Sequence, residues 1–288
     1  MHLDYLLQTM LLSLSSTSIL LIATVGLAIV FGLMGVINLA HGEFIMLGAY
    51  TALGAARAGI PFPVAVVLAS VVTAAFGALV EWLIIRRLYG RLFDTMLATW
   101  GLSLVLYQGA VICFGTVTPG IAIPTRFFQI GEYTISAYSL SMIGIAALVF
   151  GALYLLFTRT GYGVAARAAI LDPEIACAMG LQAGRVNNLT FALGAGSAGF
   201  AGAVLLPIVP ATPGMGFAFV IKAFLAVVAA GPVTLAGTVL TGGVLGAVAS
   251  ASAAFWSSVA GDILFFTATI ALLIAFPRGV SAGWRIRL

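Results

Sequence analysis

The sequence predicts an all-α polytopic membrane protein that crosses the bilayer about eight or nine times. Of its 288 residues, 62% are hydrophobic and only 7% are charged, whereas soluble domains carry about 25% charged residues. The charges leave long uncharged stretches, and a membrane helix needs about 20 apolar residues. No stretch is long or polar enough for a separate soluble domain, so residues 1–288 are expected to form a single transmembrane domain.

Nine apolar segments follow one another, and we expect one helix in each. Their ranges are 10–34, 36–56, 62–85, 95–115, 136–157, 187–210, 217–231, 235–255 and 260–277. The second, sixth and seventh are interrupted by polar residues, glycine or proline, and the second is predicted to be broken or re-entrant. Nine full spans place the N-terminus outside the cell, whereas eight spans and a re-entrant segment place it inside.

Three clusters of arginine set the predicted orientation. They are Arg86, Arg87 and Arg91; Arg159, Arg167 and Arg185; and Arg278, Arg285 and Arg287. Because cytoplasmic loops are enriched in Lys and Arg, all three clusters and the C-terminus are placed in the cytoplasm, and the loop 116–135 outside. The net charge of +4 follows from this bias, so it indicates contact with membrane lipid and no nucleic-acid partner.

A polar motif interrupts the second apolar segment. Asn38, His41, Gly42 and Glu43 stand there amid apolar residues. A carboxylate at the centre of a membrane helix costs about 2.5–3.5 kcal/mol on insertion scales, so such groups are expected to face a cavity, a partner or water. One interpretation is a broken helix that lines a solute path. The other is that His41 and Glu43 cap a helix end near the cytoplasmic surface.

A short helix with its own caps is predicted in the long cytoplasmic loop at about 159–186. Asp172 is an N-cap, Pro173 stands at the first helical position, Glu174 lies in the first turn and Gly180 suits the position after the helix. A turn over 163–170 is expected to precede it. Such a helix is suited to dock a partner protein; the alternative is an interfacial helix that lies on the bilayer.

Lys222, the only lysine in the chain, lies in the seventh apolar segment. It is expected either to neutralise a carboxylate, of the protein or of a substrate, or to extend towards the interface. Cys113 lies in an apolar span and Cys177 in the cytoplasmic loop, so both are expected to be free thiols. No metal site is expected, because structural and catalytic sites use three or four protein ligands.

The sequence contains no G-x-x-x-x-G-K-[ST] motif, so the chain cannot hold ATP in a P-loop. No cofactor is expected in this chain, and ATP and Mg would bind to separate subunits. An intramembrane enzyme built on His41 and Glu43 lacks a nucleophile paired with a base. A nucleotide-independent channel or secondary transporter, with an ion path along Asn38, His41, Glu43 and Lys222, is a competing hypothesis; the capped loop helix argues against it.

At these residues the chain resembles the permeases of branched-chain amino acid ABC importers. The stretch from Gly35 to Glu43, followed by 46–50, is similar to the most characteristic motif of that family. Residues 161–194 look like its cytoplasmic coupling segment, and Lys222–Phe224 resembles a lysine-containing segment of the same family. The resemblance covers nearly the whole chain. It implies that the chain is not an enzyme but the permease subunit of a bacterial inner-membrane importer, forming the translocation path.

The resemblance also implies partners and two sets of site residues. The partners are a second permease chain, usually a different homologous one, two ATP-binding subunits that hydrolyse ATP, and a periplasmic substrate-binding protein. The path residues are Asn38, His41, Gly42, Glu43 and Lys222. The residues that couple to the ATPase are Arg167, Asp172, Pro173, Glu174, Ile175, Ala176, Met179 and Gly180.

Two departures from the family concern the substrate. Leu97–Gly101 is more similar to the related urea and short-amide permeases, and Ala230, Gly231 and Pro232 stand where the amino acid group usually has a Gly-Gly turn. A urea or short-chain amide importer is therefore the alternative to a branched-chain amino acid importer.

Overall fold

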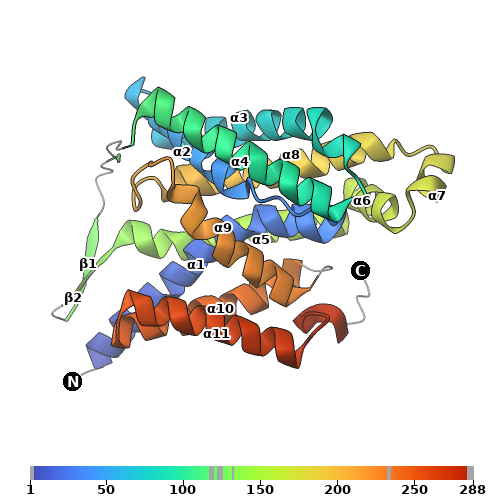
Figure 1. Cartoon of the computed structure of the whole chain (residues 1–288). Coiled ribbons are helices and arrows are strands. Elements are labelled where there is room, and N and C mark those ends of the chain that lie inside the picture. Colours follow the sequence, from blue (N-terminus) through green and yellow to red (C-terminus); the bar gives the residue numbers. More distant parts are fainter. Residues whose placement is uncertain (1–2, 117–119, 122–125, 132, 232–234, 284–288) are drawn as a thin grey trace.

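The computed structural model describes residues 3–116, 120–121, 126–131, 133–231 and 235–283, and helices dominate it (Figure 1). The helices are α1 (Leu3–Met34), α2 (His41–Arg57), α3 (Phe62–Leu83), α4 (Leu92–Phe114), α5 (Ala137–Arg159), α6 (Gly161–Leu171), α7 (Pro173–Ala178), α8 (Ala183–Leu205), α9 (Met215–Ala230), α10 (Leu235–Phe255) and α11 (Ser258–Ala275), with the short 3₁₀ helices η1 (Ile85–Arg87) and η2 (Val280–Gly283). Pro232, Arg285 and Arg287 lie outside the described residues.

Each of the nine predicted apolar segments contains a helix, which confirms the all-α membrane class. Seven of these helices are long and apolar enough to cross a membrane. The other two, α2 and α9, have 17 and 16 residues. The sixth segment is interrupted as expected, since α8 ends at Leu205, before Pro207 and Pro210. Up to that point α8 is a continuous helix of 23 residues. Its glycines lie at contacts with neighbouring helices, where small residues are favoured in lipid.

Both short helices follow a non-helical stretch, and the sequence explains each break. Gly35 has a φ of 62°, a left-handed conformation that glycine adopts without steric cost, and the chain stays non-helical up to α2. Before α9, Pro207, Pro210 and Pro213 interrupt the helix. Proline lacks the backbone N–H that a helix interior needs.

The two short helices start beside each other and run towards opposite ends of the molecule. In Figure 1, α2 runs from the middle towards the end that carries the β-hairpin, and α9 runs towards the opposite end. Ring stacking of Tyr50 on Phe114, the last residue of α4, agrees with the direction of α2. Contact of Gly231 with Gly279, beyond α11, agrees with the direction of α9.

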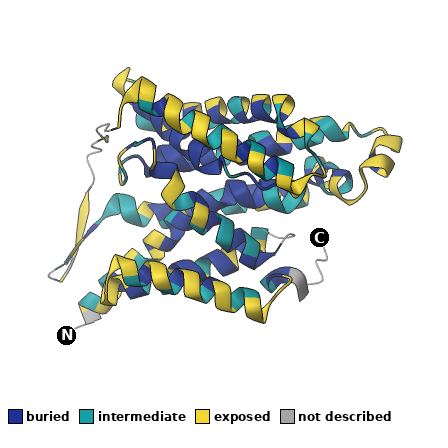
Figure 2. Ribbon diagram, in the orientation of Figure 1, coloured by how far each residue is buried: buried dark blue, intermediate teal, exposed yellow. Residues whose placement is uncertain are grey.

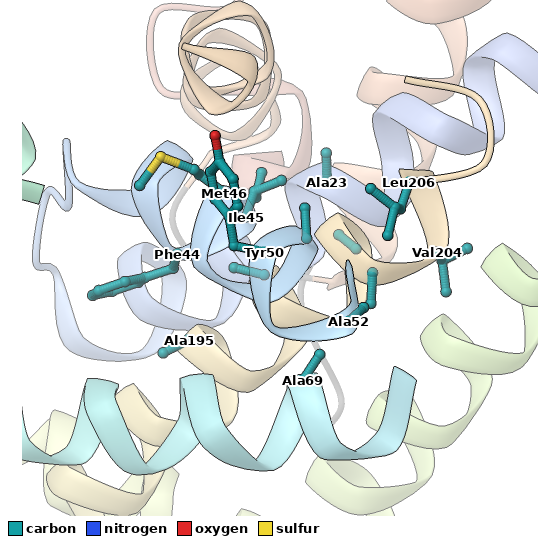
Figure 3. Packing of buried hydrophobic residues seen from close by; sticks show 14 of the residues in the cluster. Ala23, Phe44, Ile45, Met46, Tyr50, Ala52, Ala69, Ala195, Val204 and Leu206 are labelled. Atoms are coloured by element: carbon teal, nitrogen blue, oxygen red, sulfur yellow. The ribbon is translucent and has the colours of Figure 1, made fainter. Parts of the chain in front are cut away.

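The core lies where α1, α2, α3 and α8 meet, and small side chains allow the helices to approach closely. Figure 3 shows Ala23, Ala52, Ala69 and Ala195 from these four helices packed with larger residues such as Phe44. Figure 2 shows α1, α2 and α8 as the most buried part of the fold, whereas α4 and α11 present long exposed faces. Apolar side chains on those faces suit lipid or a partner chain.

The loop 116–135, expected to be an outside loop, contains a hairpin that the sequence did not predict. β1 (Phe127–Ile130) pairs antiparallel with β2 (Tyr133–Ser136). Two strands of four residues give too short an alternating pattern to be recognised. The hairpin lies at one end of the molecule, and α6 and α7 lie at the other (Figure 1).

Candidate solute pathway and coupling helix

Two side chains stabilise the non-helical stretch that precedes α2. The Oδ1 atom of Asn38 accepts a hydrogen bond from the backbone N–H of Ala40 at 3.1 Å, which shapes the turn that starts α2. Thr99 of α4 contacts the stretch from the other side. Its Oγ1 accepts from the N–H of Leu39 at 3.1 Å and lies 3.3 Å from the carbonyl oxygen of Ile37, and the carbonyl oxygen of Met96 in its own helix is 3.0 Å away. Asn38 therefore positions the start of α2.

His41, the first residue of α2, lies deep in the helix bundle. It is fully buried, and its Nε2 is 2.9 Å from the carbonyl oxygen of Ala23, so Nε2 carries the proton. Ala23 lies eleven residues before Met34, the last residue of α1, or about 16 Å from that end. His41 therefore starts a helix inside the bundle, away from the helix ends where a surface cap would lie. Its Nδ1 has no hydrogen-bond partner among the described residues.

Gly42 and Gly216 bring the starts of α2 and α9 into backbone contact. A Cβ atom on Gly42 would lie 2.7 Å from the carbonyl carbon and oxygen of Gly216, and one on Gly216 would meet the backbone of Gly42 even more closely. Real Cβ atoms essentially never lie that close to backbone. The starts of two helices, each with the partial positive charge of a helix N-terminus, therefore meet at one point.

Glu43 stands beside this contact and is almost completely buried, with 4% of its surface exposed. Its Oε1 accepts a hydrogen bond from the hydroxyl of Ser103 in α4 at 2.8 Å. Its Oε2 has no partner among the described residues. The structure thus gathers Asn38, His41, Gly42 and Glu43 at one place, as their spacing in the sequence implies.

Replacing Ser103 by Ala is expected to lower the free energy of unfolding by about 1–3 kcal/mol, because it leaves the buried Glu43 carboxylate without its described donor. The melting temperature of the purified chain in detergent measures this. Ser141→Ala is the matched control, because that hydroxyl is exposed and donates only to the Tyr138 carbonyl of its own helix. Equal melting temperatures for the two variants would contradict the assigned role of Ser103.

Lys222 lies apart from this group and has its own partner. Its Nζ is 2.6 Å from Oδ1 of Asp262 in α11, and the two side chains are 30% and 52% exposed. The prediction that Lys222 neutralises a carboxylate is met by this contact. The sequence analysis missed Asp262, although a signal existed: it is the only acidic residue after Glu174, and it stands in an apolar segment.

The loop between α5 and α8 forms two helices and then a glycine turn. α6 (Gly161–Leu171) replaces the expected turn over 163–170 and is capped by the Thr160 side chain. The Oδ1 atom of Asp172 accepts from the N–H groups of Glu174 and Ile175, both at 3.0 Å, and Pro173 starts α7. Gly180 follows with a φ of 86°. The predicted caps of the short helix are confirmed.

The side chains of this loop divide into a buried and an exposed set. Ala176 is buried, whereas Ile175 and Met179 are 63% and 80% exposed. The guanidinium of Arg167 donates to the carbonyl of Phe157, so Arg167 fastens α6 to the end of α5. Exposed apolar residues on a capped helix and directly after it are suited to form a docking surface for another protein.

A buried carboxylate at the same end of the molecule was also missed. Glu81 is fully buried; it accepts from the hydroxyl of Tyr89 at 2.5 Å and from the side-chain amide of Asn188. Burial, and then the hydrogen bond to Glu81, raise the pKa of Tyr89 above its ordinary value, so the phenol stays a neutral donor. This cluster fastens α3, the α3–α4 loop and α8 together near the helices that form the docking surface.

Comparison with known proteins fits this architecture. The family described as the permease component of branched-chain amino acid transport systems matches residues 9–275. BraD, a high-affinity branched-chain amino acid transport system permease protein of Pseudomonas aeruginosa, is 30% identical over 276 residues, covering 89% of each chain. LivH of Escherichia coli, which has the same description, is 28% identical over 297 residues, covering 96% of this chain and 95% of LivH.

More distant relatives are found among archaea. A probable branched-chain amino acid transport permease protein LivH of Methanocaldococcus jannaschii is 23% identical over 290 residues, covering 93% of this chain and 90% of the relative. No solved structure matches the chain. Because the family match takes in every long helix and both broken segments, the chain belongs to the permease components of branched-chain amino acid transport systems, and it is a multi-pass membrane protein.

Proposed function

We propose that the chain is the inner-membrane permease subunit of an ABC importer that carries branched-chain amino acids. The observation that carries this proposal is the contact of two broken helices at Gly42 and Gly216, beside buried polar groups. In transporters, discontinuous helices of this kind mark the place where the solute crosses the membrane. The names of the relatives supply the solute class.

The translocation path runs past the start of α2 and along α9. Asn38, His41, Gly42 and Glu43 line it at the helix contact, and Lys222 lines it farther along α9. Unpaired polar atoms of His41 and Glu43 and the N-termini of two helices offer hydrogen bonds to a polar solute. Alternating access requires that the α2–α9 contact opens, and the glycines allow this because no side chain interlocks across it.

The loop 159–186 couples the permease to ATP hydrolysis. It docks on a separate ATPase subunit that binds ATP and Mg. The exposed Ile175 and Met179 insert into a groove of that subunit, and the Asp172 and Gly180 caps keep the helix rigid. Nucleotide binding by the ATPase then biases the permease between two states through this contact. The end that carries α6, α7 and the C-terminus is cytoplasmic.

The importer contains four membrane-associated chains and one soluble partner. They are this chain as a single transmembrane domain, a second, homologous permease chain, two ATP-binding subunits and a periplasmic substrate-binding protein. The exposed apolar faces of α4 and α11 (Figure 2) offer the area that the second permease and lipid would cover. The β-hairpin end faces the periplasm and the binding protein.

A urea or short-chain amide is the second candidate solute, and one observation favours it. Thr99, in the stretch 97–101 that is similar to the amide permeases, contacts the backbone on both sides of Asn38. The residues that distinguish the two groups therefore touch the broken segment.

Uptake by whole cells distinguishes the two solutes. Cells that lack this gene are compared with the same cells carrying it, with labelled leucine and labelled urea supplied in parallel. Leucine uptake that is lost and restored with the gene supports the proposal. Urea uptake that behaves in this way moves the chain to the amide branch. Leucine uptake that persists when the ATPase gene is deleted would point to a nucleotide-independent transporter.

Replacing Asp172 by Ala is expected to weaken binding of the ATPase subunit about 5-fold, because loss of an N-cap costs about 1 kcal/mol. The ATPase concentration that gives half-maximal stimulated hydrolysis measures this. Asp172→Asn is the matched control, since asparagine caps helices equally well. If both variants need more ATPase to the same extent, the carboxylate acts through its charge and the cap assignment is wrong.

A further inference from the structure

A polar pocket opens between α1, α9, α10 and α11, away from the contact of Gly42 with Gly216. Its volume is about 370 Å³. The polar residues that line it are Ser13, Ser16, Lys222, Ser250, Ser258 and Asp262, and apolar residues such as Leu12 and Ala253 complete the wall. The lining thus offers charges, hydroxyl groups and aliphatic surface.

The ion pair in this pocket is partly exposed on the surface of the chain. The Lys222 and Asp262 side chains are 30% and 52% exposed although each stands on an apolar helix. Charged side chains within membrane spans face the interior, a partner or a water-filled cavity. Four serine hydroxyls around the pair add hydrogen-bonding capacity that hydrocarbon cannot use. The pocket is therefore suited to a polar occupant.

The pocket is placed where a solute would enter. The connection between α10 and α11 lies at the β-hairpin end of the molecule, opposite α6 and α7 (Figure 1), and Asp262 is four residues after the start of α11. In the proposed orientation this end is periplasmic. Lys222 lies six residues beyond Gly216 on α9, or about 9 Å along the helix axis.

We propose that this pocket binds a zwitterionic amino acid during its passage through the importer. The Lys222 ammonium binds the α-carboxylate, Asp262 binds the α-ammonium, and the aliphatic side chain lies against Leu12 and Ala253. A zwitterion brings both charges, so the ion pair opens without leaving either side chain unpaired. Urea carries no charge and cannot replace the pair. This inference rests on the proposed function.

Accessibility of the pocket is tested in the complete importer by thiol labelling. Ser250→Cys is introduced into a chain whose exposed cysteines, Cys113 and Cys177, are both replaced by Ala, and the complex is reconstituted in proteoliposomes. A membrane-impermeant thiol reagent is expected to label Cys at 250, and saturating leucine is expected to slow that labelling. Val244→Cys, on an exposed apolar part of the same helix, is the control and is expected to stay unlabelled. Failure to label position 250, or labelling at a rate that leucine leaves unchanged, overturns the proposal.

Transport by the variant Lys222→Met, Asp262→Asn tests the role of the pair. Leucine uptake is expected to fall about 10-fold or more, because hydrogen bonds to charged groups are worth about 1.5–3 kcal/mol. The melting temperature is expected to stay near that of the wild type, because both charges of the pair are removed together. A fall in melting temperature that parallels the loss of uptake would show that the pair only holds α9 to α11, and would overturn the assignment. Wild-type uptake by the variant would also overturn it, whereas absence of ATP-driven leucine uptake by the wild type would refute the proposed function itself.

Discussion

The variant Ile175→Asp, Met179→Asp is expected to abolish hydrolysis stimulated by the loaded binding protein. These two side chains are the exposed apolar residues of the coupling helix, and interface anchors of this kind are each worth about 2 kcal/mol or more. The double variant removes these anchors and puts two negative charges into the contact with the ATPase. Binding of the ATPase is therefore expected to weaken about 100-fold or more. Titration of the purified permease with the ATPase subunit measures the affinity.

The variant Ile175→Leu, Met179→Leu controls for the substitution itself. It keeps the apolar surface, and exchanges among apolar residues of similar volume are tolerated, so binding is expected to stay near that of the wild type. The caps at Asp172 and Gly180 are unchanged in both variants, and the melting temperature should stay constant. Wild-type stimulation by the double aspartate variant would show that α7 does not contact the ATPase.

Replacing Gly42 by Ala is expected to cost about 1–3 kcal/mol of stability, the usual penalty for overpacking a core, and to stop transport. The new Cβ would lie 2.7 Å from the Gly216 carbonyl, so α2 and α9 must separate. Gly54→Ala, on the same helix, is the matched control, since its Cβ would meet nothing within 4 Å and alanine favours helix by about 1 kcal/mol. Melting temperature and uptake are measured together.

Comparison of the Gly42→Ala and Gly54→Ala variants tests whether the α2–α9 contact is present in the working protein. If Gly42→Ala and Gly54→Ala have the same melting temperature and the same uptake, the backbone contact is absent from the working protein. A loss of uptake at full stability would instead show that the contact matters for movement alone.

The helices could be predicted because their signals are local. Apolar stretches long enough to cross a bilayer indicate the helices, and proline or glycine indicates where a helix is interrupted. Asp172 and Gly180 were correctly assigned as caps for the same reason, since a cap is read from its own few residues. The hairpin at 127–136 was missed because two four-residue strands carry almost no periodic signal. Within α8, the glycines look like breaks until their partners on α1, α2 and α3 are known.

The partners of the polar residues could not be predicted, because they depend on which helices meet. Nothing in the sequence joins Glu43 to Ser103 or Lys222 to Asp262, which are 60 and 40 residues apart. Likewise, the contact of Gly42 with Gly216 follows from two breaks that are distant in the chain. The polar residues of a site are therefore read from local sequence, and their grouping comes from the three-dimensional structure.

Leucine uptake by the complete importer in proteoliposomes is the measurement that tests the central claim most directly. The permease is reconstituted with its partner permease, ATPase subunits and binding protein, once with active ATPase and once with an ATPase whose P-loop lysine is replaced. The proposed function predicts that labelled leucine accumulates with the active ATPase and ATP, and stays at background with the inactive one. Equal accumulation in both preparations, or accumulation by this chain alone, would contradict it.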